Sequence, residues 1–462
     1  MLHEFIGRRE ELALLEEVYG AKRSGLIPIY GRRRVGKSEL ILRFIGDKPA
    51  LYHVGKKGPA ALQLREFLQE AALVAGEPLL ANLQARDWKT ALCALVDRWT
   101  RPEKLVLALD EFQWTAAASP ELPSVLQECW DRWWSRSGKV LLLLCGSYVG
   151  FMERTVLGRG SPLFGRRTAQ IHLKPFGYLE AAEFHPGYSL ADRARTFFIC
   201  GGVPLYLRYF SPDRSLEMNI AENFLSELSP LYREPDFLLR EELRDVESYY
   251  AVLLAVATGS ATNREISLQS GIGERSLHYY LQQLLNLGYL SRRYPLVGGP
   301  VILRQVRYVL GDPLLRFYFR FVYPNNSVIL HVGPARVLTE RIRPGLASYF
   351  GTCFEGLCRE ALPLLYAREE VAAAFEVGEY WDRATQIDVV GLRDDAWTDL
   401  GECRWGAVRT AREVVSDLEE KVLRYPNRRN ATIQRRAFTQ RPLRNAVRTA
   451  PNVRWHSLED LY

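Results

Sequence analysis

The sequence has no long apolar run. Its longest uninterrupted aliphatic stretch, Val140 to Leu144, is far too short to cross a lipid bilayer. The first seventeen residues, MLHEFIGRREELALLEE, mix acidic with basic side chains and contain no signal-peptide core. These absences argue against a membrane partner, and we expect the protein to be cytoplasmic.

Cysteine is scarce and scattered. The seven cysteines are odd in number and never form a Cys-x-x-Cys pair, which argues against both a disulfide framework and a zinc knuckle. We expect most of them to be small buried side chains. A chain of 462 residues with 47% hydrophobic and 25% charged residues predicts two to four ordinary globular domains.

Lysine is rare, and one long segment lacks acidic residues. Only ten of the 61 basic residues are lysine, and Lys421 is the only lysine after Lys174. A lysine retained in such a chain indicates a position where chemistry requires it. From Lys421 to Arg454 the sequence has ten Lys or Arg and no Asp or Glu, which favours a polyanionic partner over a solvated face of mixed charge.

A glycine-rich loop stands between an apolar strand and an apolar helical pattern in LIPIYGRRRVGKSEL, residues 26–40. Its spacing, Gly-x-x-x-x-Gly-Lys-Ser, is typical of a loop that closes its backbone N–H groups around the phosphates of ATP. Lys37 is expected to contact the β and γ phosphates, and Ser38 to bind Mg²⁺. The predicted nucleotide-binding residues here are Gly31, Arg32, Arg33, Arg34, Val35, Gly36, Lys37, Ser38 and Glu39.

A second apolar strand, KLVLALDEFQW at 104–114, delivers two carboxylates at its C-terminal end. We expect Asp110 to complete the Mg²⁺ shell and Glu111 to polarise the attacking water.

A third strand ends on Ser147, which is interpreted either as a sensor of the γ phosphate or as a helix cap. Arg166 and Arg167 are candidates for an arginine finger in a homo-oligomer, or else form an ordinary surface pair.

Six segments in this order resemble the archaeal-type P-loop ATPases of the AAA+ and STAND group. They are FIGRREELALLEEVY (5–19), the phosphate loop, LDEFQ, LCGS, SPLFGRRT and CGGVPLYL (200–207). The resemblance covers about residues 1–235 and implies an ATPase core at 1–176 and a helical lid at 177–235. It further implies that Gly7 and Arg8 line the adenine pocket and that Pro204 lies in the lid.

Residues 236–325 show short amphipathic helices followed by a hairpin, which is the order of a winged helix, with 274–287 in the recognition position. Its expected core is Ile266, Leu277, Leu281, Leu284 and Leu285. The side chains expected to face DNA are Arg275, His278, Arg292 and Arg293. A nucleotide-gated lid or a protein-docking module is the alternative for this fold.

The C-terminal segment, 326–462, resembles a PD-(D/E)XK nuclease-like domain. A predicted helix at about 345–366 carries Glu355, and predicted strands carry Asp388 and Glu402, which are expected to share a second Mg²⁺ or a Mn²⁺. Arg404 lies on the same strand face as Glu402, where the family has lysine, so catalysis is either impaired or served by Lys421 from the following helix. The basic residues expected to follow the DNA backbone are Arg428, Arg429, Arg435 and Arg436.

The sequence therefore predicts an α/β protein: a P-loop AAA+ type parallel sheet with a helical lid, a winged helix and a C-terminal restriction-endonuclease-like domain. The preferred function is an ATP- and Mg²⁺-dependent ATPase whose nucleotide state controls a DNA-binding nuclease-like domain. The alternatives are an active ATP-dependent endonuclease with a defence or restriction role, and a STAND-like switch that binds a protein partner.

Overall fold

The computed structural model describes residues 5–83, 85–299 and 305–462. The chain forms two compact units. The first runs through Phe176 and includes Val203–Leu205, and the second comprises Gly177–Gly202 and Tyr206–Tyr462. Phe176 is where we predicted the end of the ATPase core, but the first unit also includes three residues of the predicted lid, so this boundary stays a prediction. The predicted boundaries after residues 235 and 325 lie inside the second unit and stay predictions.

The first unit is built on a parallel sheet. Its strands are β1 (Gly25–Tyr30), β2 (Ala50–Val54), β3 (Leu105–Asp110), β4 (Val140–Gly146) and β5 (Ile171–His172), and they lie in the order β2-β3-β4-β1-β5. Every neighbouring pair is parallel. Strands β1, β3 and β4 are buried along their whole length, as expected for a sheet covered on both faces.

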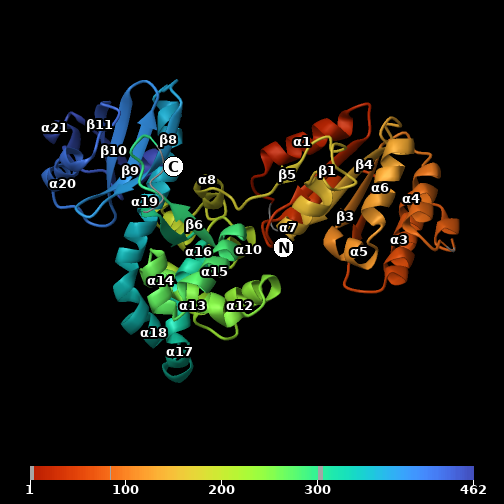
Figure 1. The fold of residues 1–462 in the computed structure, drawn as a ribbon, viewed down its shortest axis with the longest axis horizontal. Coiled ribbons are helices and arrows are strands. Elements are labelled where there is room, and N and C mark those ends of the chain that lie inside the picture. The colour runs from red at the N-terminus through yellow and green to blue at the C-terminus, as the bar shows by residue number, and fades with distance from the viewer. Residues whose placement is uncertain (1–4, 84, 300–304) are drawn as a thin grey trace. The chain divides into compact units, whose positions relative to one another are not determined.

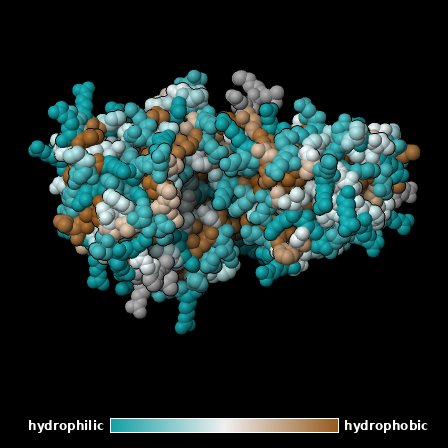
Figure 2. Space-filling view, turned by 90° about the horizontal axis from the view of Figure 1, so that it is seen from above, coloured by the Kyte–Doolittle hydropathy of each residue, from teal (hydrophilic) through white to brown (hydrophobic). Residues whose placement is uncertain are grey.

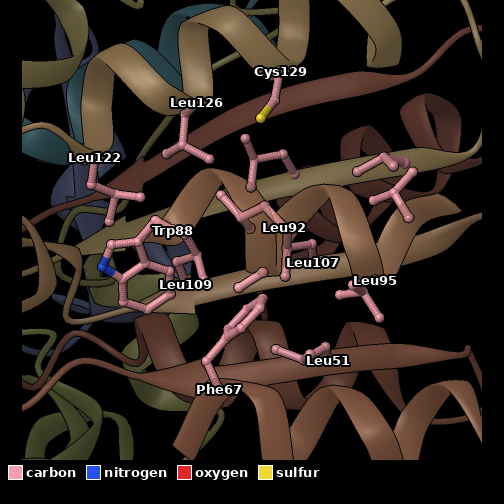
Figure 3. Packing of buried hydrophobic residues seen from close by; sticks show 14 of the residues in the cluster. Leu51, Phe67, Trp88, Leu92, Leu95, Leu107, Leu109, Leu122, Leu126 and Cys129 are labelled. Carbon is pink, nitrogen blue, oxygen red and sulfur yellow. The ribbon is translucent and has the colours of Figure 1, made fainter. Parts of the chain in front are cut away.

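Helices cover both faces of this sheet (Figure 1). They are α1 (Arg9–Gly20), α2 (Lys37–Ile45), α3 (Ala60–Ala75), α4 (Trp88–Asp97), α5 (Phe112–Ala118), α6 (Leu122–Cys129) and α7 (Val149–Met152). Leu107 of β3 packs with Phe67, Trp88 and Leu126 from α3, α4 and α6 (Figure 3). Its neighbour Val106 belongs to a separate apolar cluster that contains residues of α1 and α2. Alternate residues of each strand thus fill the two cores.

The second unit opens with helices: α8 (Tyr178–Ala182), α9 (Leu190–Cys200), α10 (Pro204–Arg208, whose first residues belong to the first unit), α11 (Leu216–Phe224) and α12 (Pro230–Glu242). The segment 246–310 follows, with α13 (Val246–Ala257), α14 (Asn263–Ser270), α15 (Glu274–Asn286) and the antiparallel pair β6 (Leu290–Arg293) and β7 (Arg307–Leu310). Of the expected core, Ile266, Leu277, Leu281 and Leu284 are buried, and Leu285 is half-buried. The order of helices and hairpin is the one predicted, and its assignment as a winged helix stays a prediction.

Four further helices lead to the C-terminal sheet: α16 (Pro313–Phe317), α17 (Asn326–Val332), α18 (Pro334–Val337) and α19 (Arg343–Arg368). The strands are β8 (Phe375–Trp381), β9 (Gln386–Arg393), β10 (Trp397–Arg404), β11 (Thr432–Thr439) and β12 (Val453–Ser457), in the order β12-β11-β10-β9-β8. Pairs β8-β9 and β9-β10 are antiparallel, whereas β10-β11 and β11-β12 are parallel. Three helices follow strands of this sheet along the chain: α20 (Ala411–Arg424) after β10, α21 (Ala446–Thr449) after β11 and α22 (Leu458–Leu461) after β12.

Helix α20 is the crossover that parallel neighbours β10 and β11 require. Tyr366 of α19 donates a hydrogen bond to Asp399, whereas Lys421 of α20 donates one to Glu402. Because residues 399 and 402 of one strand point to opposite faces, α19 and α20 cover opposite faces of this sheet. The predicted helix at 345–366 and the strands of Asp388 and Glu402 are confirmed.

The chain that leaves β6 lies against the free edge of β8. Pro295 forms a parallel bridge with Glu379, and the Leu296 N–H donates to the Glu379 carbonyl at 2.8 Å. Val297 is buried in an apolar cluster with Tyr380 of β8. The hairpin segment and the C-terminal sheet therefore share one core within the second unit.

The face of the molecule shown in Figure 2 is mainly hydrophilic, with hydrophobic residues in small separate groups. Among the described residues, no helix is both long and apolar enough to span a membrane.

Candidate functional site

The phosphate loop follows β1 and ends where α2 begins. Gly31 has a φ of 155°, and a Cβ atom there would lie 2.2 Å from the Leu173 carbonyl oxygen, so a side chain has no room. Gly36 has a φ of 93°, in the left-handed region that favours glycine. Gly31 is therefore required because a side chain would not fit, and Gly36 because of its backbone conformation. Both requirements are independent of the phosphate contact that the spacing predicts.

Lys37 is buried beneath the loop that it follows. Its Nζ donates hydrogen bonds to the carbonyls of Gly31 and Arg32 at 3.0 and 2.9 Å. Burial lowers the pKa of Lys37, and the nearby carboxylates of Glu111 and Asp110 oppose that effect. The loop thus holds an ammonium group amid its own carbonyls, at the position where the motif predicts contact with phosphate oxygens.

Ser38 and Asp110 meet although 72 residues separate them. The Ser38 hydroxyl donates to Asp110 Oδ2 at 2.6 Å, and the Tyr52 hydroxyl donates to the same oxygen at 2.5 Å. The Glu111 N–H donates to Asp110 Oδ1 at 2.8 Å. Burial and the Asp110 hydrogen bond raise the pKa of Tyr52, which keeps its proton on the phenol. The paired hydroxyl and carboxylate oxygens are hard donors that suit Mg²⁺.

Glu111 lies in a second hydrogen-bonded group. Its Oε2 accepts from the Ser147 hydroxyl at 2.9 Å and from the Gln113 amide, and that amide also donates to Ser147 at 3.0 Å. Glu111 itself has a φ of 48°, a left-handed conformation that is uncommon outside glycine. Ser147, just after β4, and Gln113, in α5, thus fix the Glu111 carboxylate. Sequence reasoning missed Tyr52, which lies outside the motifs, and Gln113, which lies in LDEFQ beside the two carboxylates that were assigned a role.

Two arginines of the first unit have structural partners. Arg8 is buried: its guanidinium donates to the carbonyls of Val35 and Lys174 at 3.1 and 2.7 Å, so it ties the phosphate loop to the segment after β5. Arg166 forms a bidentate ion pair with Asp131, with N–O distances of 2.8 and 2.7 Å. Arg166 thus has an acidic partner within the chain, and its role toward nucleotide stays a prediction.

The remaining predicted residues of the first unit lie as follows. Gly7 has a left-handed backbone, with a φ of 66°. Arg32, Arg33, Arg34 and Glu39 are half-buried, Arg167 is exposed, and Pro204 begins α10. Their roles toward nucleotide stay predictions.

The second candidate site lies at the end of β10. The carboxylate of Glu402 is completely buried and has two cationic neighbours, Lys421 Nζ at 2.5 Å and Arg404 Nη1 at 2.9 Å. Arg404 also contacts Asp417 of α20. The predicted approach of Lys421 to Glu402 is therefore present in the structure.

Asp388 and Glu355 add two more acidic groups beside Glu402. The Cys403 N–H donates to Asp388 Oδ2 at 2.9 Å, and Arg359 of α19 donates to the Asp388 carbonyl at 2.5 Å. Burial, followed by the charge of Asp388, raises the pKa of Glu355 to about 8 and that of Glu402 to about 7. Burial also raises the pKa of Asp388. The site therefore holds several carboxyl groups whose buried environment disfavours the ionised form.

No set of three or more His, Cys, Asp or Glu side chains arranged to hold a metal ion occurs in residues 5–83, 85–299 and 305–462. Glu402 Oε1 is buried and accepts no hydrogen bond from the described residues, although Arg404 lies within ion-pair distance of it. A second Mg²⁺ or Mn²⁺ shared by Asp388 and Glu402 stays a prediction.

The residues predicted to contact DNA divide into two groups. Arg275, His278, Arg428 and Arg429 are exposed, and Arg292, also exposed, donates to Gln282 at 3.1 Å. Arg293 is paired with Glu379, and Arg435 with Glu419, at 2.8 and 2.6 Å.

The prediction for Arg436 is wrong. Its side chain is fully buried and ion-paired with Asp399 and Glu369 on the α19 face of the sheet, at 2.5 and 2.7 Å. Because β11 alternates its faces, Arg435 and Arg436 point in opposite directions and cannot serve one surface. The physical reason for the buried position is compensation: Arg436 neutralises acidic groups that would otherwise be buried alone.

Comparison with known proteins supports the ATPase half of the chain. Residues 5–210 match the family described as an ATPase domain predominantly from Archaea. Residues 318–415 match a family described as archaeal and bacterial proteins of unknown function. Together with the assembled phosphate loop, the first match identifies this part as an ATPase domain of the archaeal type, and the protein as an ATPase.

Individual relatives are distant. An uncharacterized protein of Methanocaldococcus jannaschii is 28% identical over 425 residues, which cover 90% of this chain and 91% of the relative. An uncharacterized ATP-binding protein of the same organism is 48% identical over 44 residues, 10% of this chain and 75% of its own length. Among solved structures, the Walker-type ATPase of Pyrococcus abyssi has a TM-score of 0.49 at 20% identity and covers 68% of this chain and 96% of its own. The ORC2 protein of Aeropyrum pernix has a TM-score of 0.43 at 17% identity, with coverages of 74% and 96%.

Proposed function

We propose that this ATPase is Mg²⁺-dependent and that its nucleotide state controls a C-terminal, nuclease-like domain that binds DNA. The observation that carries the first part is the 2.6 Å hydrogen bond between Ser38 and Asp110. It brings together a hydroxyl from the first turn of α2 and a carboxylate from the end of β3, beside the buried Lys37. Ser38 and Asp110 would hold Mg²⁺, which neutralises charge on the β and γ phosphates.

The chain's own groups supply the rest of the hydrolysis. Lys37 exchanges its hydrogen bonds to loop carbonyls for bonds to phosphate oxygens, and this stabilises the charge that develops in the transition state. Glu111 accepts a hydrogen bond from the attacking water and orients it toward the γ phosphate. Ser147 and Gln113 position that carboxylate and donate to the γ phosphate when they release Glu111.

Arg167 is the better candidate for an arginine finger. Arg166 is held by both oxygens of Asp131, so using it as a finger would leave that carboxylate alone. Arg167 is exposed on the same loop and is available to the nucleotide site of a neighbouring copy. This assignment rests on a homo-oligomeric assembly of the ATPase.

The support for the second part is the arrangement around Glu402. One helix, three antiparallel strands, a crossover helix and two parallel strands carry Glu355, Asp388, Glu402 and Lys421. Lys421 contacts Glu402, and the charge of Asp388 contributes to the raised pKa of both Glu355 and Glu402. This is the arrangement expected of the predicted nuclease-like fold. The hairpin of the proposed winged helix lies against β8 of the same sheet, so motion of the winged helix would reach the acidic site directly.

The test uses a variant that binds ATP without hydrolysing it. Glu111→Gln keeps the volume of the side chain but loses the basic carboxylate, so we expect the rate of ATP hydrolysis to fall about a hundredfold or more, with the ATP Kd nearly unchanged. DNA affinity, measured with ATP and with ADP, should differ between the two nucleotides in this variant. Hydrolysis at the wild-type rate would refute the role of Glu111, and equal DNA affinity with both nucleotides would refute nucleotide control.

An active endonuclease is the second candidate, and the Lys421–Glu402 contact favours it. This contact gives the site the lysine that Arg404 replaces, and a lysine neutralises charge at the scissile phosphate. Incubation with Mg²⁺ or Mn²⁺, ATP and linear or supercoiled DNA decides the question, with Asp388→Ala as the inactive control. ATP-dependent oligomerisation without DNA affinity would instead favour a switch that binds a protein partner.

A further inference from the structure

Half of the basic residues in the segment from Lys421 to Arg454 are engaged in ion pairs. Five of its ten basic residues form ion pairs with acidic groups: Lys421, Arg424, Arg435, Arg436 and Arg454. The other five, which form no ion pair with any described residue, are Arg428, Arg429, Arg441, Arg444 and Arg448. A polyanion would therefore meet only part of the segment that the sequence suggests.

One member of that unpaired group lies in a groove. Helices α20 and α21 enclose a groove of about 710 Å³, and its polar lining consists of Arg412, Ser416, Asn445, Arg448 and Thr449. Val415 and Ala450 complete the lining, so the groove contains no acidic side chain. We refer to it as the α20–α21 groove. Both arginines are exposed, and neither forms an ion pair or a side-chain hydrogen bond with any described residue.

The composition of this groove favours phosphate over a protein carboxylate surface. Arginine, serine, threonine and asparagine are side chains that commonly bind the phosphates of nucleic acid, and such phosphate contacts carry no direct sequence information. A protein interface would instead present buried aromatic or aliphatic anchors at its centre. Here the apolar part of the lining is limited to one valine and one alanine.

The groove lies on the same helix as Lys421. Nine residues, or about two and a half turns of an α-helix, separate Arg412 from Lys421, so the two side chains lie on opposite sides of α20. A backbone held at Arg412 and Arg448 would therefore lie on the side of α20 opposite the contact between Lys421 and Glu402.

We propose that the α20–α21 groove binds the phosphate backbone of nucleic acid, on the side of α20 opposite the Glu402 site. The proposal rests on the proposed DNA-binding function and gives it a location that the sequence did not indicate. It assigns Arg412 and Arg448 as the main contacts, supported by Ser416, Asn445 and Thr449. Arg435 and Arg436 make no contact in this arrangement.

The test compares two double variants that lose the same charge. Arg412→Gln/Arg448→Gln removes the groove contacts, whereas Arg336→Gln/Arg341→Gln removes two exposed arginines elsewhere in the same unit. Binding of the full-length protein to a labelled duplex is followed by fluorescence anisotropy between about 50 and 200 mM salt. We expect the groove variant to bind about tenfold to a hundredfold more weakly and its log Kd–log salt slope to fall by about 2. The control variant should match the wild type within about twofold.

Each result has one meaning. If the wild type binds DNA and the groove variant equals the control, the groove assignment is wrong while the proposed function stands. If the wild type binds no DNA, the proposed function fails and the groove assignment fails with it. Competition by poly-L-glutamate as strong as by unlabelled duplex would also overturn phosphate recognition. Ser416→Asp, which adds charge without removing an arginine stem, should weaken binding as well, and circular dichroism confirms that each variant is folded.

Discussion

Lys421 Nζ lies 2.5 Å from Oε2 of Glu402, whose carboxylate is completely inaccessible to solvent. The lysine comes from α20 and the glutamate from β10, so the contact joins the crossover helix to the strand that it follows. In a chain where lysine is otherwise confined to residues 22–174, this one neutralises a buried acid. The contact stabilises the fold and supplies a lysine at the acidic site.

Lys421→Met should destabilise the C-terminal region in a pH-dependent way. Removing the ammonium leaves Glu402 with Arg404 as its cationic neighbour, and we expect a loss of about 2 kcal/mol in the free energy of unfolding at pH 8. At pH 6 the loss should be smaller, because Glu402, whose pKa is about 7, is mostly protonated there. Urea unfolding at both pH values measures the difference. Lys421→Arg, which keeps the charge, serves as the control, and an equal loss at both pH values would contradict the assignment.

The acidic site should make the protein less stable as pH rises. In the folded state the pKa of Glu355 is about 8 and that of Glu402 about 7, above the usual value of 4.5. A carboxyl group with a raised pKa binds its proton more tightly when folded, so its stabilising effect is full below about pH 4.5 and is lost as pH rises to about 8. Urea unfolding between pH 5.5 and 8.5 should show this decline.

Glu355→Gln tests the origin of that decline. The variant cannot ionise at position 355 and also removes one repulsive partner of Asp388, so the fall in unfolding free energy with pH should flatten. Glu340→Gln, an exposed position on a neighbouring segment, should leave the slope unchanged. A slope that is identical in the two variants would show that Glu355 does not titrate in this range.

Tyr52→Phe should weaken the response of the ATPase to Mg²⁺. The Tyr52 hydroxyl donates to Asp110 Oδ2, the oxygen that also accepts from Ser38, and so it orients the carboxylate. Loss of such an orienting partner typically lowers metal affinity tenfold to a hundredfold. We expect the Mg²⁺ concentration for half-maximal hydrolysis to rise about tenfold, with less change in kcat at saturating Mg²⁺. A lower kcat with an unchanged Mg²⁺ requirement would assign Tyr52 to another role.

The parts of the site that could be predicted from the sequence are those formed by residues close together in the chain. The phosphate loop is a contiguous spacing of residues, and Asp110 follows a continuous apolar strand, so both could be placed without knowing the fold. Tyr52 and Gln113 have no such signal: their positions depend on β2 lying beside β3 and on β4 ending next to Gln113. Pairing between distant strands is a tertiary property that a linear pattern does not contain.

The charge pattern of the C-terminal segment shows the same limit. Its lack of acidic residues suggested one continuous DNA-binding arm, but the acids that neutralise it come from distant positions such as Glu369 and Asp399. Strand geometry did argue against a shared surface for Arg435 and Arg436, because adjacent residues of one strand point to opposite faces. Composition alone could not show which of the two was buried.

Arg436→Ala should therefore act on stability and Arg428→Ala should not. Truncation of the buried guanidinium leaves Asp399 and part of Glu369 without their cation, so we expect a loss of about 3–5 kcal/mol in unfolding free energy. Arg428 is exposed, and its loss should change stability by less than about 0.5 kcal/mol. Arg436→Met with Asp399→Asn should recover part of the loss, because the acid is removed together with its partner. Urea unfolding of the four proteins, wild type included, measures these differences. If Arg436→Ala is as stable as Arg428→Ala, the buried ion pairs do not hold this sheet to α19.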